Sequence, residues 1–158
     1  MVFEFGVSDI AVSPSRTGPV AGILQEGGNG NLASIEQSGG NSLAQVWQLG
    51  DNNIAKVVQD GSGNELRLWQ EGSNNSANLT QIGSYNSIAA VQRGYGSVLD
   101  GRQEGVGNQA AVVLGAETTL SFSQIGNYNI IEQTMAVKTP MQITQTGNGI
   151  DMRLTPTN

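Results

Sequence analysis

Carboxamide side chains recur along this chain at a fixed spacing. Glutamine returns at every eleventh position through the middle of the chain, as at Gln37, Gln48 and Gln59. A glycine follows each of these glutamines at the second position, and an asparagine usually stands at the third position after the glycine. The chemistry of a carboxamide is hydrogen bonding, because the group carries N–H donors and a carbonyl acceptor. Identical amides that are stacked on one another can therefore bond along a ladder. The spacing predicts a structural ladder of amides and no catalytic residues.

The predicted ladder continues on both sides of the strictly periodic part. Its expected members are Gln25, Gln37, Gln48, Gln59, Gln70, Gln81, Gln92, Gln103, Gln124, Gln145, Asn31, Asn53, Asn64, Asn75, Asn86, Asn108 and Asn129. The expected turn glycines are Gly39, Gly50, Gly61, Gly72, Gly83, Gly94, Gly105, Gly126 and Gly147. The residues that depart from the pattern are Ser42, Ser97, Thr118 and Thr139 at asparagine positions and Leu114 and Met135 at glutamine positions.

Strands must position these amides. Between each asparagine position and the next glutamine, apolar residues alternate with mixed ones, as in Ala55 and Val57 or Leu66 and Leu68. A period of two indicates a strand with one buried face. We expect seven-residue strands that run from asparagine to glutamine, joined by four-residue turns in which glycine adopts a positive φ. Two strands then form one coil of about 22 residues, and residue i lies over residue i+22, about 4.8 Å away. The sequence therefore predicts an all-β fold, a β-solenoid of stacked strand-turn-strand coils in parallel register, with the amides buried at the corners of a thin core.

The repeats divide the chain into three parts. Residues 1–18 carry no repeat and are interpreted as a flexible leader, an arm or a recognition peptide. Residues 19–154 are expected to form about 13 strands, with regular repeats over 31–114 and degenerate repeats over 115–154. Residues 155–158 are a tail. The degenerate repeats fit either a structural cap, as terminal repeats often are, or a specialised docking end.

Composition excludes several classes of function. The 158 residues include no cysteine and no histidine, which argues against disulfides, the usual zinc sites and His-dependent nucleophiles. A net charge of −6 argues against nucleic acid as a partner. No segment approaches the roughly 18 consecutive apolar residues of a membrane helix, so no membrane insertion is expected, and the first residues lack a secretory signal. Acidic residues are scattered, so we expect no enzyme activity, no cofactor and no metal site.

The repeat resembles that of the curlins, the subunits of bacterial curli. The segments that carry the likeness are QLGDNNIAKVVQ, QDGSGNELRLWQ, QEGSNNSANLTQ and QIGSYNSIAAVQ, and the likeness extends over about residues 19–154. It implies a secreted protein that assembles into extracellular amyloid fibres of biofilm matrix, at the cell surface. It also implies a partner curlin subunit, an outer-membrane export pore and accessory chaperones. The even spacing and the degenerate C-terminus favour the minor, nucleating subunit slightly over the major one.

Physical reasoning links such a solenoid to a fibre. Its two ends carry unpaired strand edges, and head-to-tail docking of copies continues the coil without closing. Trp47 and Trp69 are one coil apart on the outer face, where they form either an aromatic ladder that stiffens the sheet or a lateral contact. The alternative function is a soluble, monomeric β-solenoid that binds a surface such as ice. That alternative calls for an outward threonine ladder, whereas the outward positions hold Lys, Asn, Asp, Arg and Trp.

Overall fold

The fold was determined as a computed structural model that describes residues 18–135, 138 and 140–154. The described residues form 13 strands and no helix, so none of them belongs to a helix that could cross a membrane. The strands are β1 (Val20–Glu26), β2 (Leu32–Ser38), β3 (Leu43–Asp51), β4 (Ile54–Ser62), β5 (Glu65–Ser73), β6 (Ser76–Ser84), β7 (Ser87–Tyr95), β8 (Val98–Val106), β9 (Gln109–Leu114), β10 (Thr119–Asn127), β11 (Ile130–Met135), β12 (Met141–Asn148) and β13 (Asp151–Leu154). The expected leader and tail, except Gly18, lie outside the described residues, as does Thr139.

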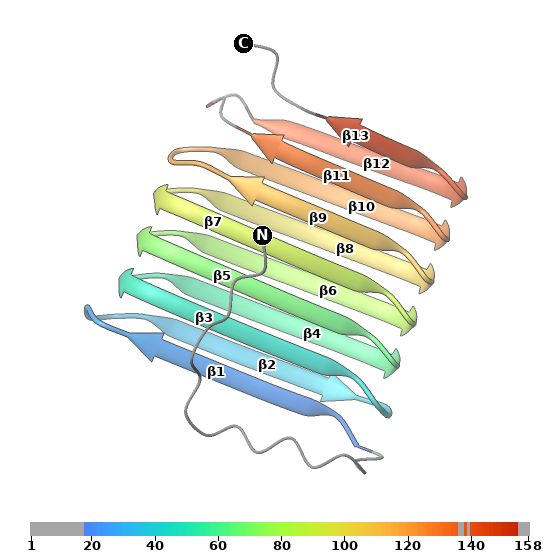
Figure 1. Ribbon diagram of the computed structural model, residues 1–158, viewed down its shortest axis with the longest axis horizontal. Coiled ribbons are helices and arrows are strands. Elements are labelled where there is room, and N and C mark those ends of the chain that lie inside the picture. The colour runs from blue at the N-terminus through green and yellow to red at the C-terminus, as the bar shows by residue number, and fades with distance from the viewer. Residues whose placement is uncertain (1–17, 136–137, 139, 155–158) are drawn as a thin grey trace, which may run out of the picture.

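The strands alternate between two parallel sheets. The odd-numbered strands form a seven-stranded sheet in the order β1 to β13, and the even-numbered strands form a six-stranded sheet from β2 to β12 (Figure 1). Every neighbouring pair is parallel, and like residues face one another, as in Gln48 with Gln70 and Gln59 with Gln81. The predicted β-solenoid, with two strands in each coil and parallel stacking in register, is therefore confirmed.

The expected strand boundaries were wrong. We expected Asn53–Gln59 for one strand, whereas β4 spans nine residues, from Ile54 to Ser62. The strand runs on because the turn residues of successive coils are also stacked: Gly61 pairs with Gly83, and Ser62 pairs with Ser84. Parallel pairing thus continues through the glycine, and the reversal itself takes fewer residues than expected.

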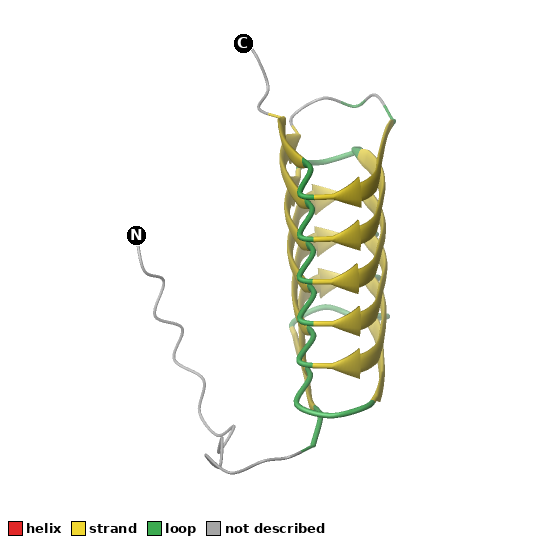
Figure 2. Ribbon diagram, turned by 90° about the vertical axis from the view of Figure 1, so that its right-hand side faces the viewer, coloured by secondary structure: helices red, strands yellow, loops and turns green. Residues whose placement is uncertain are grey.

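The two sheets lie face to face and enclose a thin core (Figure 2). Alternation along each strand sends one set of side chains inward: Leu66 and Leu68 of β5 are fully buried, whereas Arg67 between them is exposed. The corresponding residues of the other strands extend this core from Ala44 to Ile143. Since each coil adds only a few apolar side chains, buried polar groups form a large part of the interior.

One inward position of the core lacks a side chain. Gly101 of β8 is buried, and Phe122 of β10 pairs with it one coil further along. A Cβ at Gly101 would lie 2.5 Å from two atoms of the Phe122 ring and 2.8 Å from Leu79 Cδ2. The phenyl ring therefore fills the volume that the glycine leaves empty. The repeat pattern does not predict this pair, because it places glycine only in turns.

This packing predicts that a larger residue at Gly101 destabilises the protein and that a smaller residue at Phe122 partly restores its stability. Gly101→Ala should lower the free energy of unfolding by about 1–3 kcal/mol, because the new methyl group overpacks the core. Gly101 does not have a positive φ, so alanine brings no backbone strain there. Adding Phe122→Leu should recover part of the loss, which denaturant titration followed by circular dichroism can measure. Strictly additive effects of the two substitutions would contradict the proposed contact.

Candidate functional site: amide ladders along two edges

The turns line up along two edges of the solenoid. We call the edge formed by turns that follow even-numbered strands the regular edge, and the edge formed by turns that follow odd-numbered strands the irregular edge. On the regular edge, five residues always separate the glutamine position from the asparagine position, from Gln37–Ser42 to Gln145–Ile150. On the irregular edge the same interval is six residues at Gln25–Asn31, five in the next three turns and four at Leu114–Thr118.

An unbroken glutamine ladder follows the regular edge. Each Nε2 donates to the Oε1 of the glutamine one coil further toward the C-terminus, at 2.6–2.9 Å, through Gln37, Gln59, Gln81, Gln103, Gln124 and Gln145. The same Nε2 also donates to a strand carbonyl, as from Gln59 to Leu43 O at 3.1 Å. All of these glutamines except Gln37 are buried. A buried amide without hydrogen-bond partners is destabilising. The glutamines can be buried because their amides form these hydrogen bonds.

Asparagines join each turn to the next. Asn86 Nδ2 donates to Gly105 O at 3.0 Å and to Asn64 Oδ1 at 3.2 Å, and the backbone N–H of Asn86 also donates to Asn64 Oδ1, at 3.1 Å. Asn108 and Asn129 continue this arrangement on the regular edge through their backbone N–H groups. The asparagine side chain thus fixes the carbonyl of the turn glycine one coil further along.

The irregular edge loses its amides toward the C-terminus. Its glutamine ladder runs through Gln25, Gln48, Gln70 and Gln92, at 2.6–2.8 Å, and ends because Leu114 occupies the next position. Gln92 Nε2 then donates only to the carbonyls of Ser76 and Ser97. The asparagines of this edge are Asn31, Asn53 and Asn75, followed by Ser97 and Thr118. The C-terminal degeneracy noted in the sequence is thus concentrated on one edge, while the other keeps Gln124, Asn129 and Gln145.

The turn glycines adopt a backbone that other residues avoid. Gly39, Gly50, Gly61, Gly72, Gly83, Gly94, Gly105, Gly126 and Gly147 all have φ between 94° and 129°. A Cβ at most of these positions would lie 1.9–2.1 Å from the carbonyl oxygen of the glycine one coil further along. The close stacking of the turns therefore requires glycine for both conformational and steric reasons.

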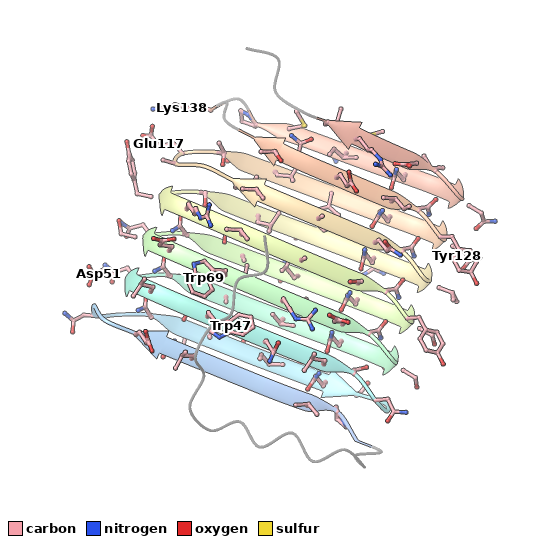
Figure 3. The ribbon with its side chains drawn as sticks, in the orientation of Figure 1. Trp47, Asp51, Trp69, Glu117, Tyr128 and Lys138 are labelled. Atoms are coloured by element: carbon pink, nitrogen blue, oxygen red, sulfur yellow. The ribbon has the colours of Figure 1, made fainter. Side chains whose placement is uncertain are left out.

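Two tyrosines on the regular edge were not singled out in the sequence. Tyr85 and Tyr128 have a φ of 57° and are 70% and 66% exposed. Their rings cover Gly63 and Gly107, where a Cβ would lie within 2.8 Å of ring atoms. Figure 3 shows Tyr128 at this edge, opposite Asp51, Glu117 and Lys138. Gly63, Tyr85, Gly107 and Tyr128 occupy the same turn position in successive coils. This alternation of glycine and tyrosine is the sequence signal that could have identified the contact of each tyrosine ring with a glycine.

Trp47 and Trp69 are stacked on the outer face of the odd-numbered sheet (Figure 3). Their ring centroids are 6.2 Å apart and the rings are tilted by 32°. The column of aligned residues that contains them is Leu24, Trp47, Trp69, Val91, Val113 and Thr134. The equivalent column of the even-numbered sheet is mostly polar: Glu36, Val58, Thr80, Arg102, Ser123 and Thr144. The two outer faces therefore differ in this column, which is apolar from Leu24 to Val113 in the odd-numbered sheet and mostly polar in the even-numbered sheet.

Charged side chains lie at the surface of the solenoid. Glu71 and Arg93, one coil apart, form an ion pair at 3.7 Å. Lys138 donates a hydrogen bond to Glu117, which raises the pKa of Lys138 above its usual value. Within the described ranges, no three acidic side chains come together as a set of cation ligands. These two ion pairs thus each join neighbouring coils.

One buried amide lies outside the ladders. Gln133 of β11 occupies an apolar inward position between Val112 and Leu154. It is 5% exposed, and its Oε1 is the buried side-chain oxygen that accepts no hydrogen bond in the described part of the chain. Gln133→Leu should therefore raise the free energy of unfolding, by about 1–2 kcal/mol.

Gln124→Leu is the matched control, because Gln124 bonds to the glutamines on both sides of it. This substitution should lower stability, and the two midpoints of denaturation should move in opposite directions. A loss of stability in Gln133→Leu would contradict the assignment of an unsatisfied amide.

In-register parallel coils, buried amide ladders and stacked glycine turns define the class of protein as an amide-ladder β-solenoid. A family model, the curlin associated repeat, matches residues 28–61 and 50–83. Residues 28–83 are therefore similar to curlin associated repeats, and this similarity supports a structural, curli-type subunit. The same register continues beyond the matched residues to β13. No curated protein and no solved structure matches the chain.

Proposed function

We propose that the protein is a structural subunit of an extracellular, curli-type amyloid fibre of biofilm matrix, in which copies add head to tail. The observation that carries the proposal is the pair of open ends. In the described residues, β1 and β2 each have a strand neighbour on one side only, and so do β12 and β13. Globular proteins usually protect such edges. A contact between two different ends does not close on itself, so it generates a filament.

The exposure of the first coil supports the same proposal. Ile23 lies at an inward position of β1, and yet 47% of it is exposed, because no coil covers it on the N-terminal side. Gln25 is exposed as well, and among the described hydrogen bonds its Oε1 accepts none. Both a core position and a ladder acceptor are thus available to a second copy.

Assembly kinetics test the proposal. Freshly desalted monomer at micromolar concentration should show a lag phase and then a rise of thioflavin fluorescence. Negative-stain microscopy of the end point should show long unbranched fibres. A folded, β-rich species that stays monomeric for days would reject the proposal and favour the alternative, a soluble solenoid that binds a surface.

The nucleating role is a narrower form of this proposal, supported by the loss of amides on the irregular edge beyond Gln92. Small amounts of this protein should then shorten the lag phase of a second curlin, its partner subunit. An unchanged lag would leave the role of major subunit. The similarity to curlins also leads us to propose export through an outer-membrane pore with accessory chaperones and a location at the cell surface. Surface immunolabelling of producing cells tests that location.

A further inference from the structure

The two sheets contain unequal numbers of strands. The odd-numbered sheet has seven strands and the even-numbered sheet has six, so β1 and β13 both belong to the odd-numbered sheet (Figure 1). At the N-terminal end β1 lies half a coil beyond β2, and at the C-terminal end β13 lies half a coil beyond β12. Two copies in the same orientation cannot continue both sheets, since placing β1 on β13 leaves a gap of one strand between β12 and the next β2.

We propose that successive copies in the fibre are related by a half turn about the stacking axis, with β1 of one copy on β12 of the previous copy and β2 on β13. The inference rests on the proposed head-to-tail assembly and adds its geometry. The half turn reverses the strand directions within the sheet plane, so β1 runs parallel to β12 and β2 runs parallel to β13. Each sheet then continues at one strand spacing, about 4.8 Å.

The inward side chains match across this contact. Extending the observed register places Ile23 on Ile143 and Gln25 on Gln145. In the other sheet it places Ala33 on Met152 and Ile35 on Leu154. These four residues are half-buried and already pack against the core. The apolar inward positions of the contact thus meet apolar residues, and Gln25 meets Gln145. The asparagine position is the exception, because Asn31 lies on Ile150, which occupies that position in the last turn.

The direction of the glutamine ladder also matches. Gln145 Nε2 donates to the carbonyls of Ile130 and Ile150. Gln48 has the equivalent two carbonyl acceptors and in addition donates to Gln70 Oε1 at 2.8 Å. Gln145 Nε2 therefore lacks the glutamine acceptor that Gln48 Nε2 has. Oε1 of Gln25 from the next copy would supply it.

The half turn has a consequence for the fibre surface. The regular edge of one copy, which ends in Gln145, is continued by the irregular edge of the next, which begins with Gln25. The apolar column of Trp47 and Trp69 then alternates between the two faces of the filament. A stack without rotation would instead place every tryptophan pair on one face.

Engineered disulfides test the rotation cleanly, because the chain contains no cysteine. In the rotated stack Ser34 of β2 lies directly over Arg153 of β13, and both residues are exposed. In the unrotated stack Gly22 of β1 lies over Arg153 instead. Aligned residues of neighbouring parallel strands have a Cα separation suited to a disulfide. Within one copy these positions lie near opposite ends: five strand spacings, about 24 Å, separate β2 from β12, and β13 lies further still, so a cross-link joins two copies.

Fibres of Ser34→Cys/Arg153→Cys and of Gly22→Cys/Arg153→Cys are grown under reducing conditions, oxidised, and run on a non-reducing gel. The first variant should yield a ladder of covalent oligomers and the second should remain monomeric. A second rotated pair, Leu32→Cys/Asp151→Cys, guards against a variant that fails to fold. Fibres that cross-link only through Gly22, or through none of the pairs, overturn the half turn. Failure of the unmodified chain to form fibres instead rejects the proposed function, and the half turn with it.

Discussion

Replacing Gly83 with alanine is expected to lower the free energy of unfolding by more than about 3 kcal/mol. Gly83 has a φ of 108°, which an L-residue with a Cβ adopts only with strain. The new Cβ would also lie 2.1 Å from Gly105 O. That carbonyl accepts the hydrogen bond of Asn86 Nδ2, so moving it away from the methyl group disturbs the next rung as well. Denaturant titration, followed by circular dichroism, measures the loss.

Gly96→Asn is the matched control for Gly83→Ala. Gly96 also has a positive φ, 66°, but no atom lies within 4 Å of a Cβ placed there. Asn52 and Asn74 occupy the same turn position in earlier coils with a φ of 55°. The control should therefore change stability by less than about 0.5 kcal/mol. If the two substitutions had equal effects, the stacking of glycine on glycine would not be what requires Gly83.

Much of the fold could be predicted because two periods coincide in the chain. The alternation of apolar residues, as at Leu66 and Leu68, indicates strands, and the return of glutamine at every eleventh position sets two strands per coil. The amide positions followed from the same reasoning, since glutamine repeated at a buried corner requires a partner of its own kind. The direction of the ladder did not follow, because either amide of a pair can be the donor until the backbone carbonyls around them are placed.

The repeat does not predict features that depend on contacts between unlike residues in neighbouring coils. Gly101 departs from the pattern, but its meaning depends on Phe122, which lies in the next coil. Gln133 stands two residues before Met135, which occupies the glutamine position, and only the pairing of β11 with β9 shows that Gln133 lies at an inward position beside Val112. The strand boundaries were misplaced for a related reason: residues that form a turn in one isolated repeat are paired once the coils are stacked.

The unequal edges show how one chain can combine a regular stack with a distinct end. The regular edge keeps its turn length and its glutamines from Gln37 to Gln145, so it can hold the coils in register by itself. The irregular edge tolerates a longer turn at Gln25–Asn31 and a shorter one at Leu114–Thr118. A turn that differs in length by one residue can leave the strand pairing intact when the opposite edge keeps the register. The strand after the shorter turn, β10, is an example, because it still pairs with β8 along its whole length.

The regular edge is therefore where removal of one amide should matter most. Gln81→Leu removes the acceptor of Gln59 Nε2, which lies 2.7 Å away, and the donor to Gln103 Oε1, at 2.9 Å. It also removes a donor to Glu65 O. Since a buried polar group without a partner is destabilising by about 1–3 kcal/mol, we expect a loss of roughly 2–4 kcal/mol in the free energy of unfolding. The change in the denaturation midpoint, at an unchanged denaturant slope, measures this loss.

The chain offers the reverse substitution as a control, because Leu114 already occupies a glutamine position on the irregular edge. Leu114→Gln supplies an acceptor for Gln92 Nε2, and the new amide can donate to Val98 O in the way that Gln92 donates to Ser76 O. Its effect should therefore be less than about 1 kcal/mol. A loss in Leu114→Gln as large as that in Gln81→Leu would mean that volume at the corner of the core, and not the hydrogen bonds of the ladder, determines stability. A large loss in Gln81→Leu together with a small change in Leu114→Gln would mean that the hydrogen bonds of the amide ladder hold the coils in register. The strands at the two ends of the solenoid, which form the proposed fibre contact, would then depend on the same ladder.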